Sequence, residues 1–182
     1  MSDMRVVLGV VAAAALLSAP LAAAEVDPRA LVLRQSDVPA GFAVDRGDTG
    51  LRTNEREAKS DPRASALFER WGRVTGYEAE FDRGSASISS RADLLRTAKG
   101  ARMLLDFFEL EMRKSGIKGL VRTRVRLGAE GWIYRGRSPF AFTVVAWRYE
   151  RVFAGVAGTG IARAETIALA RRQQRRIAAA LR

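Results

Sequence analysis

Three stretches of the chain alternate apolar and polar residues with a period of two, which predicts half-buried β-strands. In residues 76–83 the apolar positions are Tyr77, Ala79 and Phe81, and the polar positions are Glu78, Glu80 and Asp82. Residues 86–94 continue as a weaker strand. In residues 120–127 the apolar or neutral positions alternate with Arg122, Arg124 and Arg126.

The three arginines of residues 120–127 have two interpretations. They could form an anion-binding stripe, or they could lie on the solvated face of a sheet, paired across strands with the acidic residues of 76–83. Both segments have the same period and matching numbers of charges, so we favour charge pairs. Exposed pairs of this kind contribute about 0–1 kcal/mol each.

A helix is expected over residues 97–114, where apolar residues recur with helical spacing. Its main stripe is Ala101, Leu104, Leu105, Phe108 and Met112, widened by Met103, Phe107 and Leu110. So wide an arc has to be covered on more than one side. A shorter helix is predicted from about Ser60 to Trp71, with Pro62 in its first turn, where the missing N–H is harmless.

The remaining stretches complete an α+β pattern. Residues 30–42 predict a helical turn and a corner, and residues 45–53 a loop or an edge strand. Residues 140–147 are apolar on both faces, as in a central strand, and a hairpin leads to a strand at 152–156. The last helix covers residues 162–181. We therefore expect a single domain with a mainly antiparallel sheet and helices packed on one side.

The last helix carries an arginine-rich arc formed by Arg171, Arg172, Arg175 and Arg176. A basic amphipathic helix could lie on an anionic membrane surface or bind anionic polymers of the cell envelope. Alternatively, the helix packs its apolar stripe on the sheet. Because that stripe is mostly alanine, which is too small to insert strongly into lipid, we favour packing on the sheet.

The first 24 residues resemble a signal peptide. An apolar run over residues 6–19 follows Arg5, Pro20 breaks it, and Ala22-Ala23-Ala24 supplies the small residues that precede a cleavage site. An uncleaved anchor is the alternative, since residues 6–24 nearly reach bilayer length. We favour cleavage after Ala24, which leaves an exported domain, periplasmic or secreted, over residues 25–182.

Composition then excludes several classes of site. The 182 residues contain no Cys and no His, so disulfides, zinc fingers and His-assisted nucleophiles are excluded. The net charge of +11 suggests nucleic-acid binding, but nearly all of the cations are arginine, as expected from a GC-rich genome. With export, we expect no nucleic acid, no metal and no cofactor.

Other candidate chemistry is weak. Glu78 and Glu80 are a carboxylate pair, but we expect them on a flat exposed face, without the cleft that a glycosidase needs. The serines of residues 85–90 are in no nucleophile motif. The glycines Gly155, Gly158 and Gly160 resemble a phosphate-binding turn, yet a strand-to-helix connection explains them better. We therefore predict no catalytic residues.

Aromatic residues offer a candidate ligand site. Most of the tryptophans and tyrosines are expected in the core. Trp132 and Tyr134 are exceptions, because they occupy a glycine-flanked segment beside Arg135 and Arg137 that we interpret as a loop over the sheet.

The chain resembles a diffuse group of exported α+β domains of GC-rich bacteria. The resemblance rests on the Asp37-Val38-Pro39-x-Gly41-Phe42 corner, the turn at residues 127–131, the hairpin at 144–156 and the terminal helix. The group includes secreted proteins, lipoproteins and extracytoplasmic sensor-type domains, and the resemblance implies a non-enzymatic module. This chain lacks the cysteine of the lipoprotein members.

Together these observations predict a non-catalytic module that binds a small ligand between the sheet and the helix at residues 97–114. The alternative is a cationic adaptor that uses the arginine-rich helix, with peripheral membrane contact. An enzyme of unknown type is a third hypothesis. Ligand, partner and oligomeric state are not determined by the sequence.

Overall fold

The structure is a computed structural model that describes residues 26–60, 62–137 and 141–182. The predicted signal peptide and its cleavage after Ala24 lie outside the described residues. No described helix combines the length and the apolar character needed to cross a bilayer.

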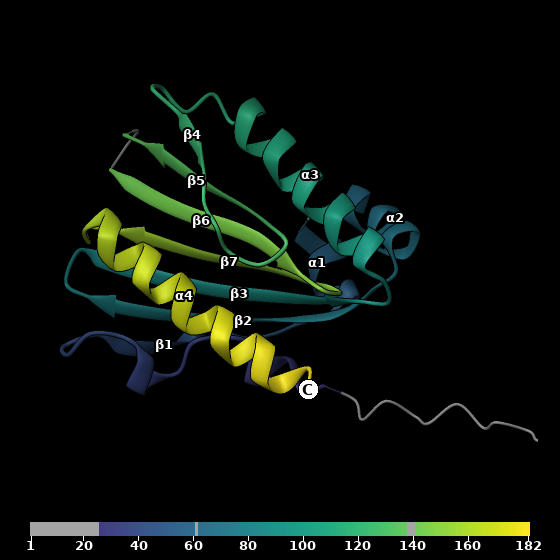
Figure 1. Ribbon diagram of the computed structural model, residues 1–182, viewed down its shortest axis with the longest axis horizontal. Coiled ribbons are helices and arrows are strands. Elements are labelled where there is room, and N and C mark those ends of the chain that lie inside the picture. Colours follow the sequence, from purple (N-terminus) through teal and green to yellow (C-terminus); the bar gives the residue numbers. More distant parts are fainter. Residues whose placement is uncertain (1–25, 61, 138–140) are drawn as a thin grey trace, which may run out of the picture.

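A seven-stranded antiparallel sheet forms the centre of the molecule (Figure 1). Its spatial order is β1-β2-β3-β7-β6-β5-β4. The strands are β1 (Ala43–Arg52), β2 (Arg73–Arg83), β3 (Ala86–Leu95), β4 (Val121–Arg124), β5 (Glu130–Gly136), β6 (Phe142–Tyr149) and β7 (Val152–Thr159). Within the described residues, four α-helices accompany them, namely α1 (Asn54–Ser60), α2 (Pro62–Trp71), α3 (Ala98–Lys114) and α4 (Arg163–Ala180). Two 3-10 turns, η1 (Pro28–Leu31) and η2 (Gln35–Asp37), precede β1. The predicted α+β class and single antiparallel sheet are confirmed.

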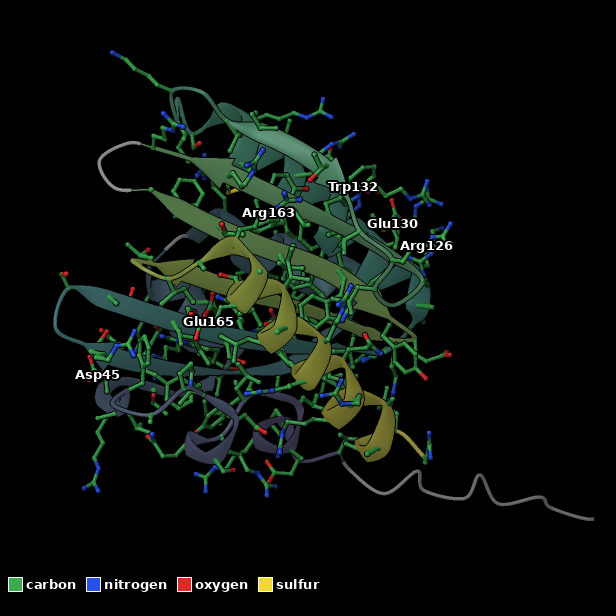
Figure 2. The ribbon with its side chains drawn as sticks, turned by 60° about the vertical axis from the view of Figure 1, so that its left-hand side comes forward. Asp45, Arg126, Glu130, Trp132, Arg163 and Glu165 are labelled. Carbon is green, nitrogen blue, oxygen red and sulfur yellow. The ribbon has the colours of Figure 1, made fainter. Side chains whose placement is uncertain are left out.

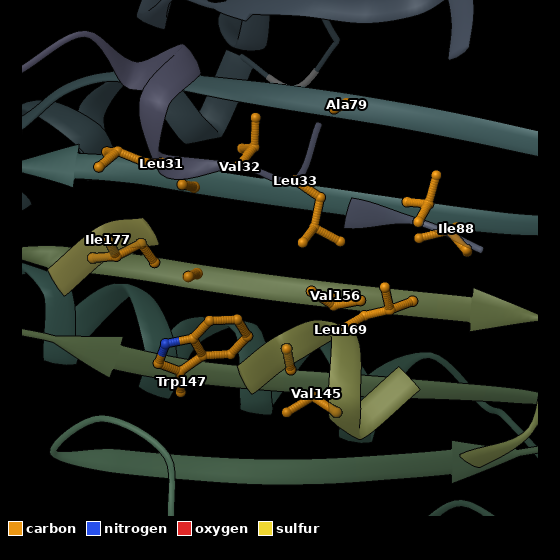
Figure 3. Close-up of a cluster of buried hydrophobic side chains, with 14 of the residues drawn as sticks. Leu31, Val32, Leu33, Ala79, Ile88, Val145, Trp147, Val156, Leu169 and Ile177 are labelled. Atoms are coloured by element: carbon orange, nitrogen blue, oxygen red, sulfur yellow. The ribbon is translucent and has the colours of Figure 1, made fainter. Parts of the chain in front are cut away.

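The helices cover both faces of the sheet, so the expectation that they pack on one side is wrong. On one face α4 packs over Val145 and Trp147 of β6 in the larger core cluster (Figures 1 and 3). On the other face α3 packs over β6, whose Ala146 and Val144 belong to the second core cluster, and α2 packs against α3 and β2. The reason is the sequence of β6, which is apolar at successive positions and therefore needs an apolar cover on each side.

A buried polar connection ties α4 to the sheet and to the N-terminal segment. The amide of Leu33 donates to Ser90 Oγ (3.0 Å), which donates to Gln173 Oε1 (2.9 Å), and Gln173 Nε2 donates to the Arg91 carbonyl (2.9 Å). Ser90 and Gln173 are fully buried. These bonds satisfy groups that would otherwise be buried without a partner, which is costly.

The strand order corrects the interpretation of the arginines in β4. β4 lies at the edge of the sheet, far from β2, so Arg122 and Arg124 make no cross-strand pairs with the acidic residues of β2. Instead, the guanidinium of Arg122 lies 3.9 Å from the ring centroid of Trp132 and contacts Glu109 of α3. Matching periods and charges do not determine which strands are neighbours.

Candidate ligand-binding groove

A groove of about 400 Å³ lies on the sheet face that α3 covers in part. We call it the α3 groove. Its lining residues are Glu57, Phe68, Glu78, Ser89, Arg91, Asp93, Leu104, Phe107, Phe108, Glu111, Val144, Phe153, Gly155 and Ala157. They come from α1, α2, α3 and the strands β2, β3, β7 and β6. This is the region, between the sheet and α3, where the sequence predicted a pocket.

Small residues of β7 form the floor. The register places Gly155 beside Arg91 of β3, and Ala157 beside Ser89. A Cβ atom added at Gly155 would have the carbonyl oxygen of Val145, 3.8 Å away, as its nearest contact. Ample space therefore lies above this position. Gly155 lies in β7, in agreement with the strand predicted at 152–156. Because β7 continues to Thr159, Gly158 also belongs to the strand and not to the predicted connection to α4.

One wall of the groove is apolar and comes mainly from α3. Thr97 caps this helix by accepting a hydrogen bond from the Gly100 amide (3.0 Å). The ring of Phe107 packs on Trp71 with centroids 5.2 Å apart, and the ring of Phe108 lies 5.7 Å from Phe153. These contacts hold the aromatic side chains in place while leaving them partly exposed towards the groove.

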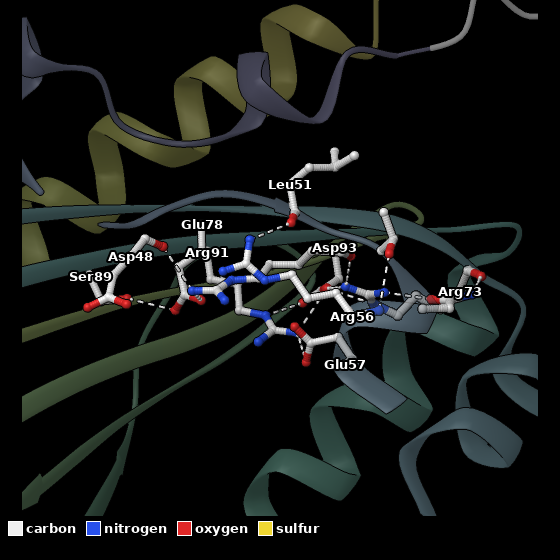
Figure 4. Close-up of polar contacts among 12 residues, drawn as sticks. Asp48, Leu51, Arg56, Glu57, Arg73, Glu78, Ser89, Arg91 and Asp93 are labelled. Atoms are coloured by element: carbon white, nitrogen blue, oxygen red, sulfur yellow. Dashed lines mark hydrogen bonds and ion pairs between the residues drawn. The ribbon is translucent and has the colours of Figure 1, made fainter. Parts of the chain in front are cut away.

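The other wall is charged, and its groups are already paired (Figure 4). Asp93 accepts from buried Arg73 (2.5 Å) and from Arg91 (2.9 Å). Arg91 also pairs with Glu57 of α1 (3.1 Å).

A second pair lies next to it on β2. Glu78 pairs with Arg52 of β1 (2.7 Å) and accepts a hydrogen bond from Ser89 (3.2 Å). The charged wall is thus a network that connects β1, β2, β3 and α1.

The pKa directions follow from this network. Burial alone would raise the pKa of Asp93, but the guanidinium groups of Arg91 and Arg73 outweigh it and hold that pKa below its ordinary value. For Arg91 burial opposes the charge, yet Asp93 and Glu57 raise its pKa. Both groups are therefore charged across the ordinary pH range.

Glu80 differs from these paired groups. Burial, aided by the nearby carboxylates of Glu78 and Asp82 and opposed by Ser89, raises its pKa from 4.5 to about 7. Between pH 4.5 and about 7 the Glu80 carboxyl group is therefore mostly protonated in the folded state and mostly ionised in the unfolded state. The free energy of unfolding therefore falls as pH rises from 4.5 to about 7.

We expect Glu80→Gln to remove this part of the pH dependence. At pH 8 the variant should be more stable than the wild type by about 1–2 kcal/mol, a figure reduced for the partial solvation of the side chain. At about pH 3.5, below the ordinary pKa of 4.5, the carboxyl group is protonated in both the folded and the unfolded state, so the two proteins should be equally stable. Urea unfolding at both values measures the difference, and an equal gain at both would show that Glu80 does not titrate near neutrality.

The structure separates the aromatic and arginine residues that were predicted as a ligand site. Residues 130–136 form strand β5, so the interpretation of Trp132 and Tyr134 as part of a loop is wrong. Tyr134 is buried against Phe108, and burial raises its pKa to about 12. Trp132 lies under Arg122, near Glu130 and Arg126 in Figure 2.

Arg135 and Arg137 line a different hollow, with Arg163 at the start of α4. Because successive side chains of a strand point to opposite faces, Arg135 cannot share a site with its neighbour Tyr134. None of these four residues lines the α3 groove.

The four arginines of the arc on α4 differ in their contacts. Arg176 donates to the Val32 carbonyl (2.8 Å) and pairs with Asp37 (3.3 Å), and Arg172 donates to the Asp37 carbonyl. Arg171 and Arg175 are exposed. The predicted packing of α4 on the sheet is confirmed, and anion binding by the four arginines stays a prediction.

Sequence reasoning missed most residues of the groove. The expectation that Glu78 and Glu80 lie on a flat, exposed face is wrong, because both are half-buried and Glu78 lines the groove. The sequence feature that could have indicated the groove is the pair Gly155 and Ala157, two small residues on the same face of a strand. Within the described part of the chain, no group of acidic side chains is arranged to hold a metal ion.

Comparison with known proteins shows the fold alone. No model of a protein family matches the sequence, and no curated protein matches it. Among solved structures, the chain is similar to the extracellular domain of PknH from Mycobacterium tuberculosis. The TM-score is 0.56 and the identity 10%, over 83% of this chain and 94% of that domain.

Proposed function

We propose that this protein is an exported module that binds a small amphipathic ligand in the α3 groove, and that it binds rather than catalyses. The observation that carries the proposal is the floor at Gly155 and Ala157, which keeps about 400 Å³ open between an apolar and a charged wall. Ligand pockets have typical volumes of about 300–1,000 Å³ and this mixture of linings.

Two further observations support it. The carboxylates of Asp93, Glu57 and Glu78 are engaged with guanidinium groups, an arrangement suited to a fixed binding wall rather than to proton transfer. The fold is shared with a domain described as extracellular, which agrees with export.

Filling the groove tests the proposal. The uncharged fluorescent probe N-phenyl-1-naphthylamine should bind residues 25–182 at one site. We expect Gly155→Leu to weaken this binding about tenfold or more, because the new side chain occupies the space above the strand. The thermal unfolding midpoint should stay near that of the wild type, since the added Cβ meets no close neighbour.

Ala157→Leu provides a second filling variant, should leucine at Gly155 disturb folding. Ala179→Leu, on the exposed face of α4, is the matched control and should bind the probe normally. Absence of probe binding by the wild type, or equal binding by both filling variants and the control, would refute the α3 groove as a ligand site.

A further inference from the structure

We infer that the ligand of the α3 groove is an amphipathic organic cation; this rests on the proposed function and specifies its ligand class. The first observation is the sign of the lining charge. Four carboxylates, those of Glu57, Glu78, Asp93 and Glu111, face one guanidinium, that of Arg91. Carboxylates thus outnumber cations among the residues that line the groove, although the chain as a whole has a net charge of +11. The cations Arg52, Arg73 and Lys114 pair with these carboxylates but do not line the groove.

Nε and Nη2 of Arg91, the cation of the groove, are already directed at carboxylates. Arg91 directs Nε to Asp93 and Nη2 to both Asp93 and Glu57. Arg52 and Arg73, behind the wall, are likewise taken up by Glu78 and Asp93. An anionic ligand that used these donors would have to displace the pairs, and it would lie beside the four lining carboxylates. Charge therefore discriminates against it.

The carboxylates retain capacity for a cation. Glu78 has one oxygen on Arg52 and the other on the Ser89 hydroxyl, but an ionised carboxylate has about four acceptor positions. Glu111 lies on α3, is exposed, and meets Lys114 at 3.6 Å. A positively charged head group has acceptors on the β2 side and on the α3 side.

The apolar wall fits the rest of such a molecule. Leu104 and the rings of Phe107 and Phe108 offer an alkyl or aryl body a surface that excludes water. Aromatic faces also attract cations, most of all quaternary ammonium groups. The same wall that binds the body thus adds to the preference for a positive head.

A matched set of amphiphiles tests the charge preference. Octyltrimethylammonium, octyl glucoside and octyl sulfate share one chain and differ in head-group charge, and each displaces N-phenyl-1-naphthylamine if it enters the groove. We expect the cation to displace the probe at a concentration about tenfold lower than octyl sulfate requires, with the glucoside between them.

Charge variants connect the preference to the groove. In the double variant Glu78→Gln/Glu111→Gln the preference for the cation, measured as the ratio of displacing concentrations and corrected for that variant's own probe affinity, should fall below about threefold. Glu109→Gln is the matched control, because Glu109 is a carboxylate of α3 that pairs with Arg113 and Arg122 and does not line the groove.

The outcomes separate the two proposals. Equal displacement by all three amphiphiles, or a preference for octyl sulfate, would overturn the inference about charge and leave the groove as a binding site. A cation preference unchanged in the double variant would also overturn it. Failure of the uncharged probe to bind the wild type would instead contradict the proposed function, ligand binding in the α3 groove.

Discussion

Asp93→Ala should lower the free energy of unfolding by about 3–5 kcal/mol, because it leaves the charge of Arg73 buried without its anion. The side chains of Arg73 and Asp93 are 0% and 1% exposed. Without the carboxylate, Arg73 keeps Asn54 Oδ1 and the Arg52 carbonyl as acceptors, which supply hydrogen bonds but no opposite charge. Urea unfolding measures the loss.

Asp106→Ala is the matched control for this experiment. It removes a carboxylate that also faces an arginine, Arg102, but this pair spans 3.9 Å and is more than half exposed. We expect a loss below about 1 kcal/mol. Equal losses in the two variants would contradict the assignment of a buried ion pair beside the groove.

The effect of Asp93→Ala should also depend on pH. The pKa of Asp93 is lower in the folded state than its ordinary 3.8, so its stabilising contribution is complete above that value. The contribution is lost as pH falls through the folded pKa. The stability difference between wild type and variant should therefore shrink below about pH 4.

Trp147→Ala should lower the free energy of unfolding by a similar amount, about 3–5 kcal/mol. Trp147 is fully buried between the sheet and α4, in the same cluster as Leu169 and Ile177 (Figure 3). Alanine would leave a cavity in the middle of this core. Denaturant unfolding of the purified variant provides the measurement.

Trp147→Phe separates volume from hydrogen bonding at this position. The indole Nε1 is buried and has no hydrogen-bond partner, so replacing the ring with phenyl removes an unsatisfied donor while most of the volume remains. We expect a loss well below that of alanine. If alanine and phenylalanine cost the same, the packing assigned to the α4 face is wrong.

The elements with regular periodicity could be predicted from the sequence. β2 alternates from Tyr77 to Asp82, and the stripe of α3 has helical spacing, so both were placed to within about three residues. β5 was missed because Gly131 and Gly136 flank a short apolar run, a pattern also typical of loops. Tyr134 of β5 is buried against Phe108 of α3, and Ile133 belongs to the core cluster of the opposite face, neither of which the local sequence reveals.

The groove itself depends on strand order. Glu78, Arg91 and Gly155 form a transverse row because β2, β3 and β7 are neighbours in the sheet. β7 follows β3 in space but not in sequence. Likewise, Arg73 and Asp93 are 20 residues apart, and only the pairing of β2 with β3 brings them together. The pocket between the sheet and α3 was predicted, but its residues were not.

The most direct test of the α3 groove as a ligand site is a crystal structure of residues 25–182 with octyltrimethylammonium. We predict that its octyl chain lies along Phe107 and Phe108 above Gly155, with the ammonium group between Glu78 and Glu111. Density for the amphiphile elsewhere, with the groove unoccupied at saturating concentration, would contradict the account.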